Sequence, residues 1–104
     1  MKQDFSKSPA IEQVAIERLE QIEKHGWTQE IDLNYEKKEL RDAALYAMTL
    51  DPRWWPIGWS EHFRQKIYAK TRKQRMVVAA ALLCAEIDRL DNGGIDQDLQ
   101  TPNK

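Results

Sequence analysis

The chain of 104 residues has 41% hydrophobic and 32% charged side chains, a composition typical of one small globular domain. No apolar run approaches the roughly 20 residues of a membrane-spanning helix. The start MKQDFSKSPA has no export signal, so we expect a cytoplasmic protein. A net charge of −1 argues against double-stranded DNA as a partner.

The first predicted helix begins after Ser8, because serine is a favoured N-cap and Pro9 suits the first helical position. Gly26 ends this helix, since glycine readily adopts the left-handed conformation of a helix C-terminus. Apolar spacing gives the helix an inward face. This face comprises Ile11, Val14, Ala15, Arg18, Leu19 and Ile22.

The second predicted helix runs from about Tyr35 to Leu50. It ends before Asp51-Pro52, because the residue before a proline avoids the helical conformation. Small alanines on its inward face would let another helix approach closely. The inward residues are Leu40, Ala43, Ala44, Ala47 and Leu50.

Two further helices follow an irregular segment that is rich in tryptophan and proline. Ser60 caps a short helix that ends at Tyr68. Thr71 and Gln74 match a capping box, so a long helix begins near Arg72 and continues to about Leu90. Residues 8–91 therefore form the ordered core of one domain, and residues 92–104 form a polar tail. The prediction is an all-α bundle of three main helices and one short helix.

The run MVVAAALLCA, residues 76–85, is apolar around its whole circumference. A helix of this kind is normally buried on all sides. The single cysteine, Cys84, is therefore expected to be a small buried side chain. Three neighbouring helices would not cover the run completely, so we expect the bundle to be completed by self-association as a homo-oligomer.

Two acidic pairs have helical spacing: Glu17 with Glu20, and Glu39 with Asp42. Carboxylates three residues apart share one side of a helix, and oxygen ligands suit Mg²⁺. Glu17 and Glu20 project opposite to the apolar face of their helix. This geometry favours solvated helix faces, with a metal site as the alternative.

The arrangement ExxE followed by ExxD resembles the signature of the MazG-type all-α nucleoside triphosphate pyrophosphatases. In that family, such carboxylates hold Mg²⁺, which binds the triphosphate and activates water. The resemblance implies Mg²⁺ as a cofactor, with Glu17, Glu20, Glu39 and Asp42 as its ligands.

Aromatic and basic residues are concentrated in the segment from position 54 to position 75. Aromatic rings can stack on a base, and cations at a helix start can hold phosphate. The alternatives are tryptophans that pack against the bundle end, a solvated basic face, or a protein interface. The candidate ligand-binding residues are Trp54, Trp55, Trp59, Lys70, Arg72, Lys73 and Arg75.

Several blocks between about residues 14 and 91 carry a second resemblance. They are Glu17-Arg18, Gln21-Ile22-Glu23, Gly26-Trp27-Thr28, Glu30, Glu39-Leu40, Ala43-Ala44, Tyr46, Trp54-Trp55-Pro56 and Ala85-Glu86-Ile87-Asp88-Arg89-Leu90. Together they resemble a family of small helical proteins of tailed phages and prophages. The resemblance implies a phage origin and the cytoplasm of a bacterial host, without a particular chemistry.

The leading hypothesis is a non-enzymatic phage-type protein that modulates host defence or metabolism. It would bind a nucleotide-like or phosphorylated ligand, or a host protein, without a cofactor. One alternative is a Mg²⁺-dependent, MazG-like nucleoside triphosphate pyrophosphatase. The other is a protein inhibitor that acts through the tryptophan-rich segment.

Overall fold

The fold is all-α, with three longer helices and one short helix, as predicted. The computed structural model describes residues 8–25 and 38–96, and this part contains no strand. The helices are α1 (Pro9–His25), α3 (Glu39–Thr49), α4 (Glu61–Tyr68) and α5 (Arg72–Asp91), with a short 3₁₀ helix η2 (Pro52–Trp54) between α3 and α4. In this part of the chain, no helix is long and apolar enough to span a bilayer.

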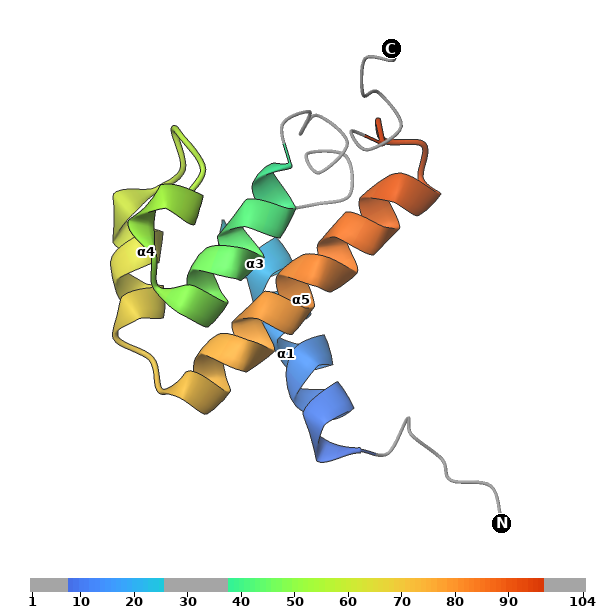
Figure 1. Cartoon of the computed structure of the whole chain (residues 1–104). Coiled ribbons are helices and arrows are strands. Elements are labelled where there is room, and N and C mark those ends of the chain that lie inside the picture. Colours follow the sequence, from blue (N-terminus) through green and yellow to red (C-terminus); the bar gives the residue numbers. More distant parts are fainter. Residues whose placement is uncertain (1–7, 26–37, 97–104) are drawn as a thin grey trace.

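The long helix α5 is the centre of the arrangement. It packs against α3 and against α1, and these are the two main helix–helix contacts of the described chain. Figure 1 shows α5 crossing in front of α1, with α3 alongside and α4 beyond α3.

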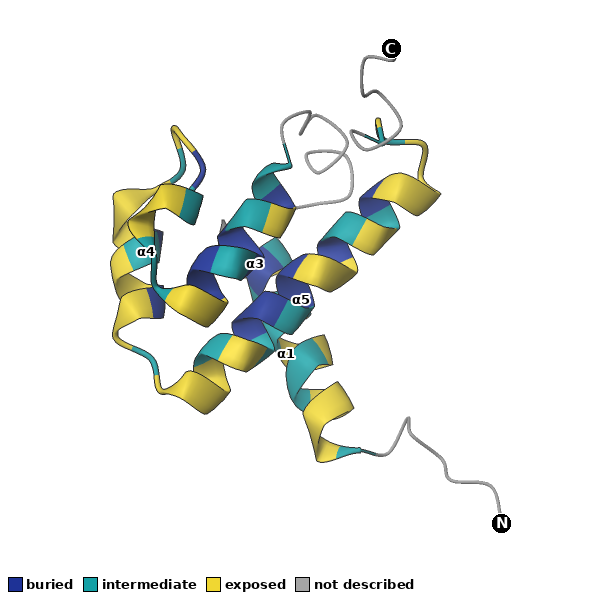
Figure 2. Ribbon diagram, in the orientation of Figure 1, coloured by how far each residue is buried: buried dark blue, intermediate teal, exposed yellow. Residues whose placement is uncertain are grey.

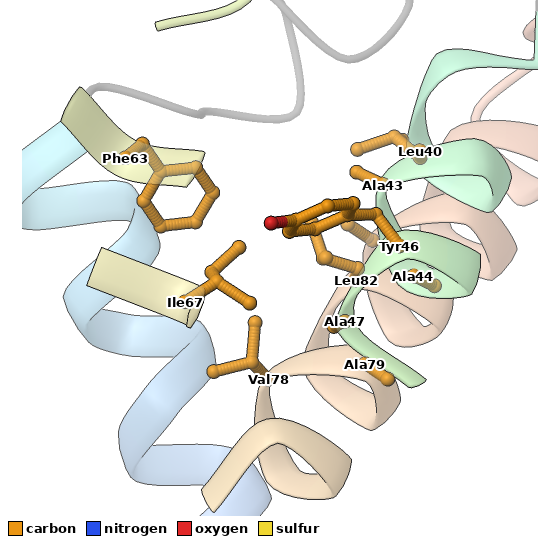
Figure 3. Packing of buried hydrophobic residues seen from close by; sticks show 11 residues of the cluster. Leu40, Ala43, Ala44, Tyr46, Ala47, Phe63, Ile67, Val78, Ala79 and Leu82 are labelled. Carbon is orange, nitrogen blue, oxygen red and sulfur yellow. The ribbon is translucent and has the colours of Figure 1, made fainter. Parts of the chain in front are cut away.

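The hydrophobic core lies between α3, α4 and α5. Alanines of α3 and α5 allow the two helices to approach closely, and the ring of Tyr46 fills the space toward α4 (Figure 3). Figure 2 shows the buried residues on the facing sides of α3 and α5. The core residues are Leu40, Ala43, Ala44, Tyr46, Ala47, Phe63, Ile67, Val78, Ala79, Leu82 and Ala85.

Three predicted helix starts are confirmed by their hydrogen bonds. The Ser8 hydroxyl accepts from the amide of Ala10 at 3.2 Å, and the Ser60 hydroxyl accepts from the amide of Phe63 at 3.1 Å. At the start of α5, the Gln74 amide donates to the Thr71 hydroxyl. The Thr71 amide donates to the Gln74 side chain, which completes the capping box.

The predicted continuous helix from Tyr35 is interrupted at Lys38, the first described residue of this part of the chain. The described helix α3 begins at Glu39, because Lys38 has a left-handed backbone with a φ of 63°. It ends at Thr49, since Leu50 is also left-handed, with a φ of 61°. Tyr35, Gly26 and the tail from residue 97 lie outside the described residues.

The prediction for the inward face of α1 is also wrong in part. Ile11 and Leu19 are 45% and 53% exposed, whereas Gln21 is fully buried and Glu17 is half-buried. The buried amide of Gln21 donates a hydrogen bond to the Glu17 carboxylate at 3.2 Å, which lowers the cost of burying both polar groups. The helix can therefore turn a polar side toward the bundle.

The apolar run of α5 is not buried on all sides in the single chain. Its face toward α3 is buried, but Met76 and Leu83 are exposed, and Met76 also lines a groove beside α1. Cys84 is exposed as well, which corrects the expectation of a buried cysteine. The reason is that the helices packed against α5 cover only part of its circumference.

Candidate functional site

A cleft of about 450 Å³ lies between α1 and the start of α5. Two lysines, Lys70 and Lys73, contribute positive charge to its wall. The other lining residues mostly carry hydrogen-bonding groups. The complete lining is Gln13 and Glu17 from α1 with Lys70, Thr71, Lys73, Gln74 and Val77.

The amino end of α5 adds to the positive potential of this cleft. The capping box uses the amides of Thr71 and Gln74. The amides of Arg72 and Lys73 are the first two of the helix, so they have no acceptor within it. The dipole of α5 places about half a positive charge at this end. An anion in the cleft would therefore meet two ammonium groups and a helix N-terminus.

A carboxylate stands on the α1 side of the same cleft. Glu17 is half-buried and accepts a hydrogen bond from Gln21, whose side chain is completely buried. A buried partner holds the carboxylate in place more firmly than a solvated one would. Glu17 and the neighbouring Gln13 can accept hydrogen bonds from hydroxyl or amino groups of a ligand. Sequence analysis missed Gln13 because a single glutamine on a helix has no distinguishing signal.

The tryptophans are not part of this cleft. The ring of Trp55 lies 5.2 Å from that of Tyr46, and 5.7 Å from those of both Trp59 and Phe63. Trp54 and Trp59 are partly buried against the same core. These contacts match the alternative in which the tryptophans pack against the end of the bundle.

The four predicted basic residues also separate into different roles. Lys70 and Lys73 line the cleft, and Arg72 is exposed beside it. Arg75 points toward α3, where its guanidinium donates to the carbonyl oxygen of Ala47 at 2.9 Å. The structure therefore brings Lys70 and Lys73 together in one cleft and places Arg75 at a helix contact.

A second cleft, of about 380 Å³, lies beside the tryptophan-rich segment. Two ion pairs lie at this cleft. Asp42 pairs with Arg41 at 2.6 Å, and Arg53 pairs with Asp51 at 2.7 Å. Beside it, Ile57 is fully exposed. The lining residues are Glu39, Asp42, Arg53, Trp55, Pro56 and Ile57.

The four acids of the two predicted pairs do not form one metal site in this structure. Glu17 lines the first cleft, whereas Glu39 and Asp42 line the second. Among the side chains that the structure describes, in residues 8–23 and 38–96, no three Asp, Glu, His or Cys residues are grouped so that they could hold a metal ion. The arrangement does not fit a Mg²⁺ ion shared by both pairs.

Glu39 instead lies near a buried arginine of α5. Arg89 is almost completely buried, and its guanidinium forms two hydrogen bonds with Glu86, at 2.7 and 2.9 Å. Hydrogen bonding to Glu86 raises the pKa of Arg89, and the carboxylates of Asp96 and Glu39 add to this effect. Glu39 therefore helps to balance a charge inside the bundle.

In comparisons with known proteins, no protein-family model, no curated protein and no solved structure matches this chain. What bears on its function is therefore the arrangement of the residues described above.

Proposed function

We propose that the protein binds a phosphorylated, nucleotide-like ligand in the cleft between α1 and the start of α5, without changing it chemically. The observation that carries this proposal is that Lys70 and Lys73 line one cleft at the amino end of a long helix. Such a helix end attracts phosphate even without a basic side chain, and the lysines increase that attraction. Sequestering such a ligand is how the protein would modulate host defence or metabolism.

The residues of α1 that line the cleft, Gln13 and Glu17, favour a nucleotide over inorganic phosphate as the ligand. Inorganic phosphate would gain from the lysines and would be repelled by the Glu17 carboxylate. A nucleotide carries ribose hydroxyls, which can donate hydrogen bonds to a glutamate. Acidic residues accept such hydrogen bonds in dinucleotide-binding folds. The volume of about 450 Å³ lies within the range of small-molecule pockets.

Titration calorimetry with a panel of nucleotides, including cyclic and ADP-ribose-type species, tests this proposal. Lys73→Ala is expected to weaken binding about tenfold, the effect of losing one charged hydrogen bond. Arg72→Ala removes the same charge from the adjacent exposed position outside the cleft, and should weaken binding much less. Equal losses of affinity in the two variants would mean that the ligand is held by general electrostatic attraction and not by this cleft.

A change at Glu17 separates the two walls of the cleft. Glu17→Gln keeps the size of the side chain and removes its charge. Affinity for a ribonucleotide should fall, because the ribose loses a charged acceptor. Affinity for inorganic triphosphate should rise, because a repulsive charge is gone. If both affinities rise, the ribose does not contact this residue.

Mass spectrometry of the ligand recovered after heat denaturation tests the non-enzymatic part of the proposal. In the presence of Mg²⁺, the ligand should be recovered intact. Conversion of a nucleoside triphosphate to monophosphate and pyrophosphate would instead support the MazG-like alternative. Glu39→Gln, which changes a residue outside the cleft, should then abolish turnover.

A second candidate function is binding to a host protein through the tryptophan-rich segment. The observation that favours it is Ile57, which is fully exposed at a turn beside Gly58 and next to the second cleft. A large apolar side chain in this position is an expected anchor for a partner. Ile57→Asp should abolish such a complex, while Tyr68→Asp, at another exposed site, should preserve it.

A further inference from the structure

A largely exposed side of α5, next to α1, carries an apolar face. Residues three and four positions apart align on one side of a helix, and five residues of α5 follow this spacing. Met76, Leu83 and Ile87 are exposed large apolar side chains, and Cys84 is exposed beside them. We call this set the α5 face; its members are Met76, Ala80, Leu83, Cys84 and Ile87.

The α5 face has opposite charges at its two ends. Lys73 lies one turn before Met76, and Asp91 lies one turn after Ile87; both charged residues are exposed. The distance from Lys73 to Asp91 along the helix is about 27 Å. The face therefore has a basic end, an apolar middle and an acidic end.

This pattern is symmetric about one position. Leu82 is the midpoint of Lys73 and Asp91, and it is also the midpoint of Ala80 and Cys84. A second α5 running antiparallel would therefore place Lys73 against Asp91 of the partner subunit. The same register places the exposed Met76 near Ile87 of the partner subunit. A patch that complements itself in this way is the requirement of a two-fold interface.

We infer that the α5 face binds a second copy of this chain in antiparallel orientation. The apolar middle would lose its contact with water, which is the main driving force of association. The charged ends fix the direction, because a parallel pair would bring like charges together. This inference does not depend on the proposed ligand.

Helix α1 extends the same interface. A groove of about 350 Å³ between α1 and α5 is lined by four apolar residues of α1, by Arg18 and by Cys84. The two-fold axis of such a pair is perpendicular to the plane that contains both α5 helices. The two Cys84 residues therefore lie on the same side of that plane, and so do the two α1 helices. Ile11 and Ala15 would then face the other copy, in an arrangement of four helices. This explains why α1 exposes apolar residues that the sequence predicts to be buried.

Sedimentation equilibrium is the first test. The wild-type chain is expected to show twice its mass of 12.2 kDa. Ile87→Glu places a charge in the apolar middle and should restore the monomer mass. Met48→Glu changes an equally exposed apolar residue on α3 and should leave the dimer intact. A monomeric wild type at high concentration, or an Ile87→Glu dimer, would overturn the inference.

The single cysteine gives an independent readout of the register. In the antiparallel pair, the two Cys84 positions are separated by about 6 Å along the helix axes. With helix axes about 8–10 Å apart, their Cα atoms are too distant for a disulfide but within reach of a short bismaleimide. The reagent should yield a covalent dimer with wild-type protein and not with Ile87→Glu. A dimer that resists this cross-link has a different interface.

Exchanging the charged ends tests direction without disturbing the apolar middle. Lys73→Asp should weaken the dimer about tenfold, since two symmetric ion pairs become repulsive. The double variant Lys73→Asp with Asp91→Lys should recover the wild-type dissociation constant. Because Lys73 also lines the ligand cleft, these variants are compared by mass alone. Failure of the double variant to recover dimerisation would exclude the antiparallel register.

Discussion

The guanidinium Nη1 of Arg75 donates a hydrogen bond to the carbonyl oxygen of Ala47 at 2.9 Å, which ties the start of α5 to the end of α3. The last turn of α3 has no basic residue of its own. At the carboxyl end of α3, Arg75 therefore supplies a hydrogen-bond donor for a carbonyl group that has no partner within the helix. It also supplies a positive charge, which the helix dipole favours at this end. Arg75 therefore has a structural role, although residues next to it in the sequence line the cleft between α1 and α5.

Replacing Arg75 with alanine should therefore destabilise the protein. The variant loses a charged hydrogen bond, so its free energy of unfolding should fall by about 1.5–3 kcal/mol. Arg72→Ala removes an equal charge from an exposed position and should change stability by less than about 0.5 kcal/mol. Urea unfolding followed by circular dichroism measures both values. Two variants of equal stability would contradict the structural role of Arg75.

Gly94 is required because the chain folds over a buried arginine. A Cβ at this position would lie 2.7 Å from Cγ of Arg89 and 2.8 Å from its carbonyl oxygen. Gly94→Ala is therefore expected to cost about 1–3 kcal/mol of stability, as in other overpacked sites.

The adjacent glycine provides the control. Gly93 has a φ of 89°, and a Cβ added there would meet no atom within 4 Å, so its constraint is the backbone alone. Asparagine tolerates positive φ, so Gly93→Asn should cost less than Gly94→Ala. Thermal unfolding of the two variants compares them directly. The steric explanation fails if Gly94→Ala is as stable as the wild type.

Trp55 should contribute to stability more than to ligand affinity. Its ring contacts three other aromatic rings at the end of the bundle, so Trp55→Ala should cost about 3–5 kcal/mol. The buried indole N–H has no acceptor among the described residues, so Trp55→Phe should cost clearly less. Chemical denaturation tests this order, with Ile57→Ala as an exposed control. A Trp55→Ala variant that is as stable as the wild type but no longer binds the ligand would instead indicate that Trp55 is part of the binding site.

The features that the sequence predicts correctly depend on neighbouring residues. Ser60 as a cap, and Thr71 with Gln74 as a capping box, are recognisable because each hydrogen bond spans only three positions. The all-α fold follows from the same local patterns. Gln74, which also lines the cleft, was identified only through its role in the capping box.

The features that the sequence does not predict depend on how helices meet. The apolar spacing of α1 does not reveal that Gln21 is buried while Leu19 is exposed, because that choice depends on contacts with α5. Likewise, Trp55 and Lys73 belong to one aromatic and basic segment of the sequence, but the structure places them in different clefts. Sequence proximity therefore gave a candidate site that combined two separate regions.

A final prediction concerns the pH dependence of stability at α4. Arg64 donates a hydrogen bond to the Tyr46 hydroxyl at 3.1 Å and also pairs with Glu61. Hydrogen bonding from Arg64 lowers the pKa of Glu61 below its ordinary value of 4.5. A carboxyl with a lowered pKa stabilises the folded state above its ordinary pKa, and this contribution is lost as the pH falls through the lowered value.

Glu61→Gln should consequently have a slightly lower Tm than the wild type at pH 7, because an exposed ion pair contributes little. The difference should shrink as the pH falls below 4.5, where the wild-type carboxyl becomes protonated and loses its advantage over the amide. Calorimetric scans from pH 3 to pH 7 measure this trend, and Glu23→Gln, at an exposed position on α1, corrects for the loss of one negative charge. A difference in Tm that is constant across this range would show that the charge on Glu61 does not stabilise α4.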